Sequence, residues 1–103
     1  MEDKELLIKA IDHYTFYTSV QRKLLKLLVQ IEIDHVVKAN VLELSKITNI
    51  SRASIYRIIS IFQQEGIISL PIKENLKLNQ IILIPEKLEL IKDNFLKKTH
   101  LQL

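Results

Sequence analysis

Two arginines and a tyrosine stand among small residues in the stretch from Ser51 to Gln64, which reads SRASIYRIISIFQQ. A guanidinium group can donate paired hydrogen bonds to guanine edges or to phosphate oxygens, so Arg52 and Arg57 could both bind a nucleic acid. Ala53 is small enough to lie close to the methyl group of thymine. The stretch itself contains no acidic residue, and the first one after it is Glu65. The stretch therefore favours recognition of duplex DNA.

A helix is the element that would bring these side chains onto one surface. The apolar residues of the stretch recur at i, i+3, i+4 and i+7, which predicts one buried stripe formed by Ile55, Ile58, Ile59 and Phe62. The opposite face then points outward. It is predicted to carry Arg52, Ala53, Tyr56, Arg57, Ser60 and Gln63, with Ser54 at its border.

A tight turn is predicted just before this helix. Ser45 is small, as is needed where a second helix crosses the first, and Asn49 tolerates the left-handed backbone that such a turn requires. Ile50 then enters the core, and Ser51 can accept a hydrogen bond from an unpaired backbone N–H of the next helix. The helix before the turn should span about Val41 to Thr48.

This pattern resembles a bacterial winged helix-turn-helix domain. The matching positions are small Ser45, the turn residue Asn49, apolar Ile50, the cap Ser51, buried Ile55 and Ile58, and the ending Gln64-Glu65-Gly66-Ile67-Ile68. Asn49 departs from the family, which most often has glycine there. The resemblance spans residues 18–85 and implies a winged fold, with the helix from Ser51 to Gln64 in the major groove of DNA.

Capping patterns and hydrophobic spacing place the other helices. Thr18 with Gln21, and Asn40 with Glu43, have the spacing of a capping box. An N-terminal helix is predicted from Asp3 to about Tyr14, and it either covers the core or pairs with a second subunit. The helix after Thr18 is apolar on two sides, formed by Leu24, Leu27, Leu28 and Ile31 and by Leu25 and Val29. The aromatic residues at the junction of these helices, Tyr14, Phe16 and Tyr17, are assigned to the core.

Short strands and a last helix complete the predicted fold. Apolar or β-branched runs predict strands at residues 35–38, 67–70 and 81–84. Pro85 suits the first turn of a helix, and Glu86 complements its positive N-terminal end. The chain is thus predicted to be a single domain, residues 1–103, mainly α with a small β-hairpin wing: an N-terminal helix at 1–17, a winged helix-turn-helix core at 18–85 and a C-terminal helix at 86–103.

The segment between the two hairpin strands carries Lys73 and Lys77. At the tip of a wing their ammonium groups would lie near the phosphate backbone or the minor groove, whereas the alternative is a plain solvated turn. Ser51, Ser54 and Tyr56 would contact phosphates or sugars. The candidate DNA-binding residues are Lys46, Ser51, Arg52, Ala53, Ser54, Tyr56, Arg57, Ser60, Lys73 and Lys77.

The formal net charge of +3 is unevenly placed along the 103 residues. Residues 1–50 carry seven basic and seven acidic residues, so the whole excess lies in the second half. Residues 44–80 carry five basic residues and two acidic ones. The predicted reading helix and wing therefore account for the excess, as expected if they meet a polyanion. The alternative is that scattered surface charge happens to fall this way.

Little in the sequence supports catalysis or a bound cofactor. The chain has no cysteine, which excludes a disulfide framework and a thiolate metal site. His13, His35 and His100 are far apart, and none has a carboxylate at ligand spacing. Gly66 is the only glycine, so a glycine-rich phosphate loop is excluded. We expect neither an enzyme nor a metal or cofactor site.

The N-terminal sequence Met-Glu-Asp-Lys-Glu is acidic where a secretory signal would be basic. No apolar run approaches the ~18 residues that a membrane span needs. These features predict a cytoplasmic protein without a membrane partner.

The leading functional hypothesis is a homodimeric, sequence-specific binder of double-stranded DNA that regulates transcription. Leu90, Leu101 and Leu103 would leave spare apolar surface on the C-terminal helix for a dimer contact, and the alternative is that this helix packs on the N-terminal one. A second hypothesis is a centromere-binding adaptor of a plasmid or phage partition system, with a filament-forming partner such as a tubulin-like protein. A third is a winged helix used only for protein contact.

Overall fold

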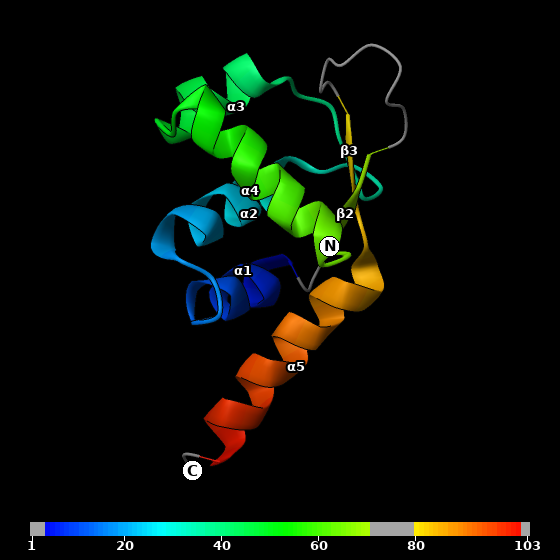
Figure 1. Cartoon of the computed structure of the whole chain (residues 1–103). Helices are drawn as coiled ribbons and strands as arrows, with labels where there is room; N and C mark the ends of the chain where they lie inside the picture. Colours follow the sequence, from blue (N-terminus) through cyan, green and yellow to red (C-terminus); the bar gives the residue numbers. More distant parts are fainter. Residues whose placement is uncertain (1–3, 71–79, 102–103) are drawn as a thin grey trace.

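A computed structural model describes residues 4–70 and 80–101 of the chain (Figure 1). The elements in chain order are α1 (Lys4–Asp12), α2 (Ser19–Ile31), β1 (Val36–Val37), α3 (Val41–Thr48), α4 (Arg52–Gln64), β2 (Ile68–Ser69), β3 (Ile81–Leu83) and α5 (Pro85–Leu101). Every helix and strand predicted from the sequence is present, with boundaries that differ by a few residues at most. The predicted wing tip, with Lys73 and Lys77, lies outside the described residues.

Two capping boxes set where α2 and α3 begin. The Thr18 hydroxyl accepts a hydrogen bond from the backbone N–H of Gln21 (3.2 Å), whose side-chain oxygen accepts one from the N–H of Thr18 (2.9 Å). Asn40 and Glu43 repeat the arrangement at the start of α3, with distances of 2.8 and 2.9 Å. Each box satisfies two backbone N–H groups that a helix start would otherwise leave unpaired, which confirms both predictions.

The turn between α3 and α4 has the predicted left-handed residue. Asn49 has φ 62° and ψ 25°, and the Ile50 side chain is buried behind it. The Ser45 hydroxyl donates a hydrogen bond to the Ile50 carbonyl (2.6 Å), and the Thr48 hydroxyl accepts one from the Ile50 N–H (3.2 Å). These bonds fix the chain as it leaves α3, and Ser51 then caps α4 by accepting from the N–H of Ser54 (3.2 Å).

Helix α4 ends in a turn that requires its glycine. Gly66 has φ 76°, a left-handed conformation that residues with a Cβ rarely adopt. Its N–H donates to the Gln63 carbonyl (3.1 Å), and the N–H of Ile67 donates to the Phe62 carbonyl (2.9 Å). These two bonds form a Schellman motif, which satisfies the last carbonyls of α4 and turns the chain directly into β2.

The sheet has three short antiparallel strands in the order β1-β3-β2. Val36 pairs with Ile82 and Val37 with Ile81, while Ile68 pairs with Leu83. Strands β2 and β3 are therefore the base of the predicted hairpin wing, and β1 adds the third strand. With α2, α3 and α4 these strands form a winged helix-turn-helix fold, extended by α1 and α5.

The core lies between α4, α2, α3 and the sheet. Phe62, Ile55, Leu24, Leu28 and Leu44 are fully buried. Two predictions need correction. Ile31, predicted in the first apolar stripe of α2, is 37% exposed at the end of the helix, whereas Leu25 and Val29 of the second edge are buried as predicted. Among the aromatic residues, Tyr17 is buried, but Phe16 lies in the turn and is 76% exposed, with its ring 5.3 Å from the Tyr14 ring.

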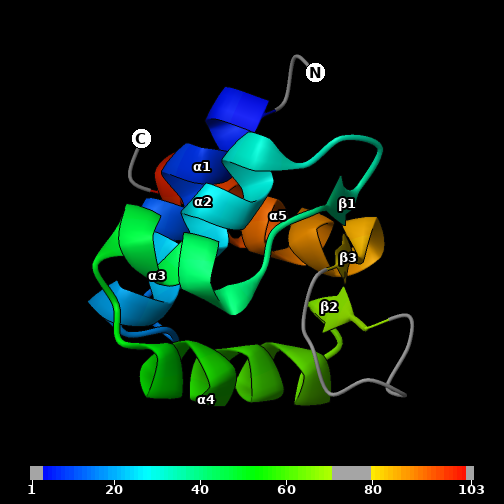
Figure 2. The ribbon, with the colours of Figure 1, turned by 90° about the horizontal axis from the view of Figure 1, so that it is seen from above.

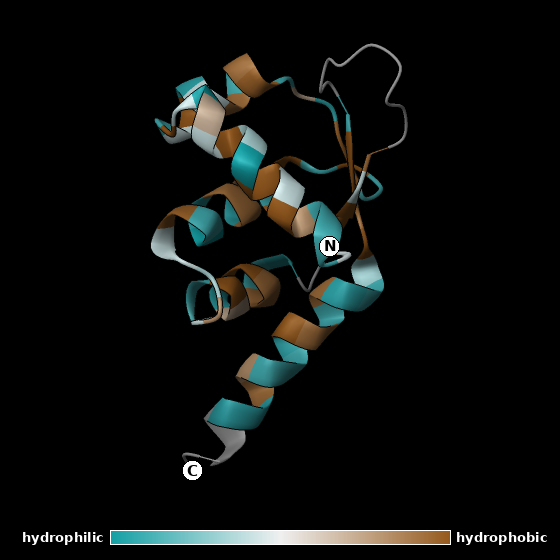
Figure 3. Cartoon of the chain, viewed as in Figure 1, coloured by the Kyte–Doolittle hydropathy of each residue, from teal (hydrophilic) through white to brown (hydrophobic). Residues whose placement is uncertain are grey.

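Helices α1 and α5 pack on each other at the side of the core (Figure 1). Leu88 and Ile91 of α5 are buried, and the Phe95 ring lies 5.2 Å from the His13 ring. This is the packing that the sequence offered as the alternative to a dimer contact. Hydrophobic and hydrophilic residues alternate along α5 (Figure 3). Leu90 of this helix remains 60% exposed.

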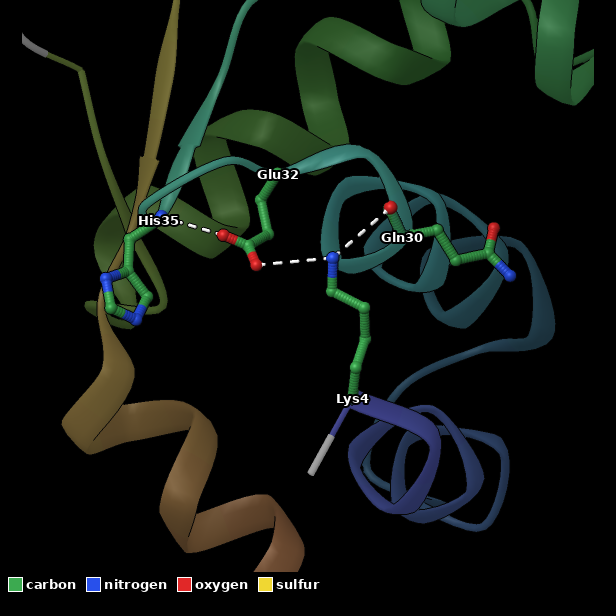
Figure 4. Close-up of polar contacts among 4 residues, drawn as sticks. All are labelled: Lys4, Gln30, Glu32 and His35. Atoms are coloured by element: carbon green, nitrogen blue, oxygen red, sulfur yellow. Dashed lines mark hydrogen bonds and ion pairs between the residues drawn. The ribbon is translucent and has the colours of Figure 1, made fainter. Parts of the chain in front are cut away.

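A clamp formed by Lys4 and Glu32 holds the turn between α2 and β1 (Figure 4). Asp34 (φ 52°) and His35 (φ 70°) are both left-handed, and Ile33 exchanges backbone hydrogen bonds with Val36. Two left-handed residues between such a pair form a type I′ turn. The Glu32 carboxylate accepts from the His35 N–H (2.7 Å) and pairs with the Lys4 ammonium (3.3 Å). The clamp thus connects α1 to the strand that supports the wing.

Candidate nucleic-acid interface

Helix α4 lies along one outer side of the molecule, with the other elements on a single side of it (Figure 2). Its apolar stripe faces inward, as predicted, and its opposite face is open to solvent. Tyr56 is 51% exposed at the middle of that face. The exposed residues on this face, which we call the α4 face, are Ser51, Arg52, Ala53, Tyr56, Arg57, Ser60 and Gln64.

Three polar side chains form a chain of hydrogen bonds at the start of α4. The Ser51 hydroxyl donates to the Ser54 hydroxyl (3.0 Å), and the Arg57 guanidinium donates to the same Ser54 oxygen (3.3 Å). Ser54 is only partly exposed. Its hydroxyl therefore contacts Arg57 within the protein, and the predicted contact of Ser54 with a phosphate or sugar stays a prediction.

The positive charge of the α4 face is not neutralised within residues 4–70 and 80–101. The ion pairs in that part of the chain join Lys4 to Glu32, Lys26 to Asp12 and Lys92 to Glu89, and none involves Arg52 or Arg57. Lys46 is exposed in the last turn of α3, just before the turn into α4. Lys46, Arg52 and Arg57 thus have no carboxylate partner among the residues that the structure describes.

The carboxylate closest to this face in sequence is held at the far end of the helix. Glu65 follows α4 and accepts a hydrogen bond from the Tyr17 hydroxyl. Burial, this hydrogen bond and the charge of Glu65 raise the pKa of Tyr17 above its ordinary value. Burial and the charge of Glu65 likewise raise the pKa of Tyr14.

The structure brings together most of the predicted site. Arg52, Ala53, Tyr56, Arg57 and Ser60 share the α4 face with Ser51, and Lys46 lies on the adjacent helix. Gln63, which was predicted to face outward, is only partly exposed. Gln64 is exposed instead, and because it lies four residues after Ser60, extending the helical spacing could have found it. Sequence reasoning also left out Ile47, which is 62% exposed beside Lys46.

A cavity of about 80 Å³ lies among α1, α5 and the turn before β1. Its walls include Leu7, Val29 and Leu88, and Lys4 and Glu32 lie at its border. This volume is well below the ~300 Å³ at which ligand pockets usually begin. Another hollow, of about 470 Å³, lies beside the turn before β1, and its lining includes Ile33 and Lys38. Within the described part of the chain, no group of three or more His, Asp or Glu side chains is arranged to hold a metal ion. No helix there is long and apolar enough to cross a membrane.

Comparison with known proteins supports the fold. No protein-family model and no curated protein sequence matches the chain. Among solved structures, the crystal structure of transcriptional regulator PA3341 is similar, with a TM-score of 0.52 and 16% sequence identity. The match covers 90% of this chain and 69% of that protein. At this level of identity the similarity establishes a shared fold.

Proposed function

We propose that the protein binds double-stranded DNA in a sequence-specific manner, as a homodimer, and regulates transcription. The observation that carries the proposal is the α4 face, where Arg52 and Arg57 are exposed and have no carboxylate partner within the described residues. A convex helix with cationic and small side chains fits the major groove of B-DNA. The similar fold of a protein described as a transcriptional regulator supports the same conclusion.

Each side chain of the α4 face has a role that follows from its chemistry. Arg57, oriented by Ser54, would read a base edge, and Arg52 would contact a base or a phosphate. Ser51 and Tyr56 would donate hydrogen bonds to phosphate or sugar oxygens, and Lys46 would add a phosphate contact from α3. Lys73 and Lys77 would act from the wing.

A homodimer would present two copies of α4 to the DNA. With two-fold symmetry the binding site should be an inverted repeat, with half-sites about 34 Å apart on one side of the duplex. The exposed Leu90 side chain of α5 provides a candidate dimer contact. Light scattering of the purified protein tests this part of the proposal, because it distinguishes a dimer of about twice 12.1 kDa from a monomer.

The function is tested by anisotropy titration of the protein on its own upstream DNA and on a random duplex of equal length, at two salt concentrations. We expect tighter binding to the upstream DNA. Arg57→Ala should weaken that binding by about 5- to 150-fold, the range that corresponds to one base contact. Lys9→Ala is a matched control, because Lys9 is an exposed cation of α1, and Figure 2 shows that α2 and α3 lie between α1 and α4. Equal loss in both variants would contradict the assignment of the α4 face.

The flanking helices favour a second candidate function. Helices α1 and α5 are additions to the winged core, as expected of a small adaptor that binds DNA and also presents a surface to a partner. Such a protein could serve plasmid or phage partition, together with a filament-forming protein. A ladder of cooperative complexes on upstream repeats would favour this role, whereas a single complex would favour a repressor. The open α4 face argues against a winged helix used only for protein contact.

A further inference from the structure

Tyr17 joins the turn between α1 and α2 to the far end of α4. Its side chain is only 5% exposed, and its ring lies 5.3 Å from the ring of Phe62 on the inner side of α4. Its hydroxyl donates a hydrogen bond to the Glu65 carboxylate, across 48 positions of the sequence. The contact therefore unites two parts of the chain that are not neighbours along the backbone.

The turn that carries Tyr17 is itself fixed in place. The Arg22 guanidinium of α2 donates hydrogen bonds to the carbonyl oxygens of Tyr14 (3.4 Å) and Tyr17 (2.5 Å). The Tyr14 ring lies edge-on to the Tyr17 ring at 5.2 Å. Both acceptors are backbone carbonyl oxygens, so the Arg22 side chain stabilises the backbone of the turn. Tyr17 is thus a fixed point against which another element can be positioned.

Glu65 connects Tyr17 to the C-terminal end of α4. Glu65 directly follows the last residue of α4 and caps the helix. Its N–H still donates a hydrogen bond to the Ile61 carbonyl (3.0 Å). The other end of α4 is fixed to α3 through Ser45 and the left-handed Asn49. A rigid helix held at both ends has one orientation, and its exposed face then has one orientation relative to the DNA.

We propose that Tyr17 is a positioning residue for DNA recognition: its hydrogen bond to Glu65 sets the orientation of α4 and thereby the register of Arg52 and Arg57 on the bases. The proposal rests on the proposed function. It assigns to the turn between α1 and α2 a role in specificity, although that turn lies outside the α4 face. Base readout depends on the direction of paired hydrogen bonds, whereas attraction to the phosphate backbone tolerates a tilted helix.

The wild-type protein first enriches its preferred duplex from a random pool of DNA. The test then measures, for each variant, the ratio of its affinity for this enriched duplex to its affinity for a random duplex of the same length. Tyr17→Phe removes only the hydroxyl, and Glu65→Ala removes only the acceptor. Each should lower the ratio of the two affinities about tenfold, the scale of one lost base contact, and the double variant should lower it no further. Glu65→Gln keeps an acceptor oxygen and should retain the wild-type ratio. Tyr14→Phe is the matched control, and thermal melting reports on the stability of each variant.

The outcomes separate the two proposals. A wild-type protein without preference for any enriched duplex would overturn the proposed function, and the role of Tyr17 with it. If the wild type is specific but Tyr17→Phe and Glu65→Ala keep its affinity ratio, even at a lower melting temperature, Tyr17 is structural and the positioning role is refuted. Equal losses in Glu65→Gln and Glu65→Ala would also refute it, because the charge rather than the hydrogen bond would then matter.

Discussion

Replacing Glu32 by glutamine should destabilise the protein far more than the same change at Glu89. Both carboxylates pair with a lysine, Glu32 with Lys4 at 3.3 Å and Glu89 with Lys92 at 2.8 Å. Their surroundings differ, because the Glu32 side chain is 8% exposed and the Glu89 side chain is 57% exposed. Glu32 also accepts the backbone N–H of His35, which holds a turn with two left-handed residues.

The expected loss of stability in Glu32→Gln follows from the interactions of the carboxylate that a neutral amide makes more weakly or not at all. A hydrogen bond to a charged acceptor contributes about 1.5–3 kcal/mol and a neutral one about 0.5–1.5 kcal/mol, so the exchange costs about 1 kcal/mol. Loss of the Lys4 ion pair adds up to about 1 kcal/mol, since Lys4 remains partly in water. We expect Glu32→Gln to lower the free energy of unfolding by about 1–2 kcal/mol. Glu89→Gln should change it by less than about 0.5 kcal/mol.

The assay is denaturant unfolding of the wild type and both variants between pH 7 and pH 3. Burial would raise the pKa of Glu32, but the His35 N–H and the Lys4 ammonium outweigh it and hold the pKa below the value of 4.5 for a free side chain. A carboxyl with a lowered folded-state pKa stabilises the protein above its unfolded-state pKa, and that stabilisation is lost as pH falls through the folded-state value. The difference between wild type and Glu32→Gln should therefore be largest near neutral pH and shrink under acid. The stabilising role of the clamp would be refuted if both glutamine variants lowered the free energy of unfolding equally. It would also be refuted if the difference between wild type and Glu32→Gln grew as the pH fell.

Two further changes test the left-handed positions. His35→Gly should raise the free energy of unfolding by about 0.5–1 kcal/mol, because glycine adopts φ 70° without strain and Asp-Gly suits a type I′ turn; a fall in the melting temperature would contradict this. Asn49→Val should lower it by about 1–2 kcal/mol, whereas Asn49→Gly should be nearly neutral, because only the β-branched residue is strained at φ 62°. Denaturant unfolding measures both, and similar stabilities of the two Asn49 variants would argue against a left-handed residue there.

Features set by local chemistry could be predicted from the sequence. The two capping boxes, the turn at Asn49, the cap at Ser51 and the buried stripe of α4 each depend on residues within one or two helical turns. The outward position of Arg52, Tyr56 and Arg57 followed from the same spacing. These features place most of the candidate site.

Other features depend on contacts between distant residues. The bond between Tyr17 and Glu65 joins positions far apart in the chain, and no periodicity indicates it. The type I′ turn escaped prediction because His35 stands where such a turn usually has glycine. Its backbone is held by Glu32 and by Lys4 of another helix. The exposure of Phe16 likewise depends on how α1 meets α2, which hydrophobicity alone does not determine. The homodimer and the role of the wing lysines stay predictions.

The most direct test of the central claim is an NMR titration of the ¹⁵N-labelled protein with a DNA duplex enriched from a random pool. If the α4 face reads DNA, the largest changes in chemical shift should fall on Arg52, Ala53, Tyr56, Arg57 and Ser60, with smaller ones at Lys46. The exposed residues of α1 should change little. Changes centred on α5 or on the turn before β1, with the α4 face unaffected, would contradict the account.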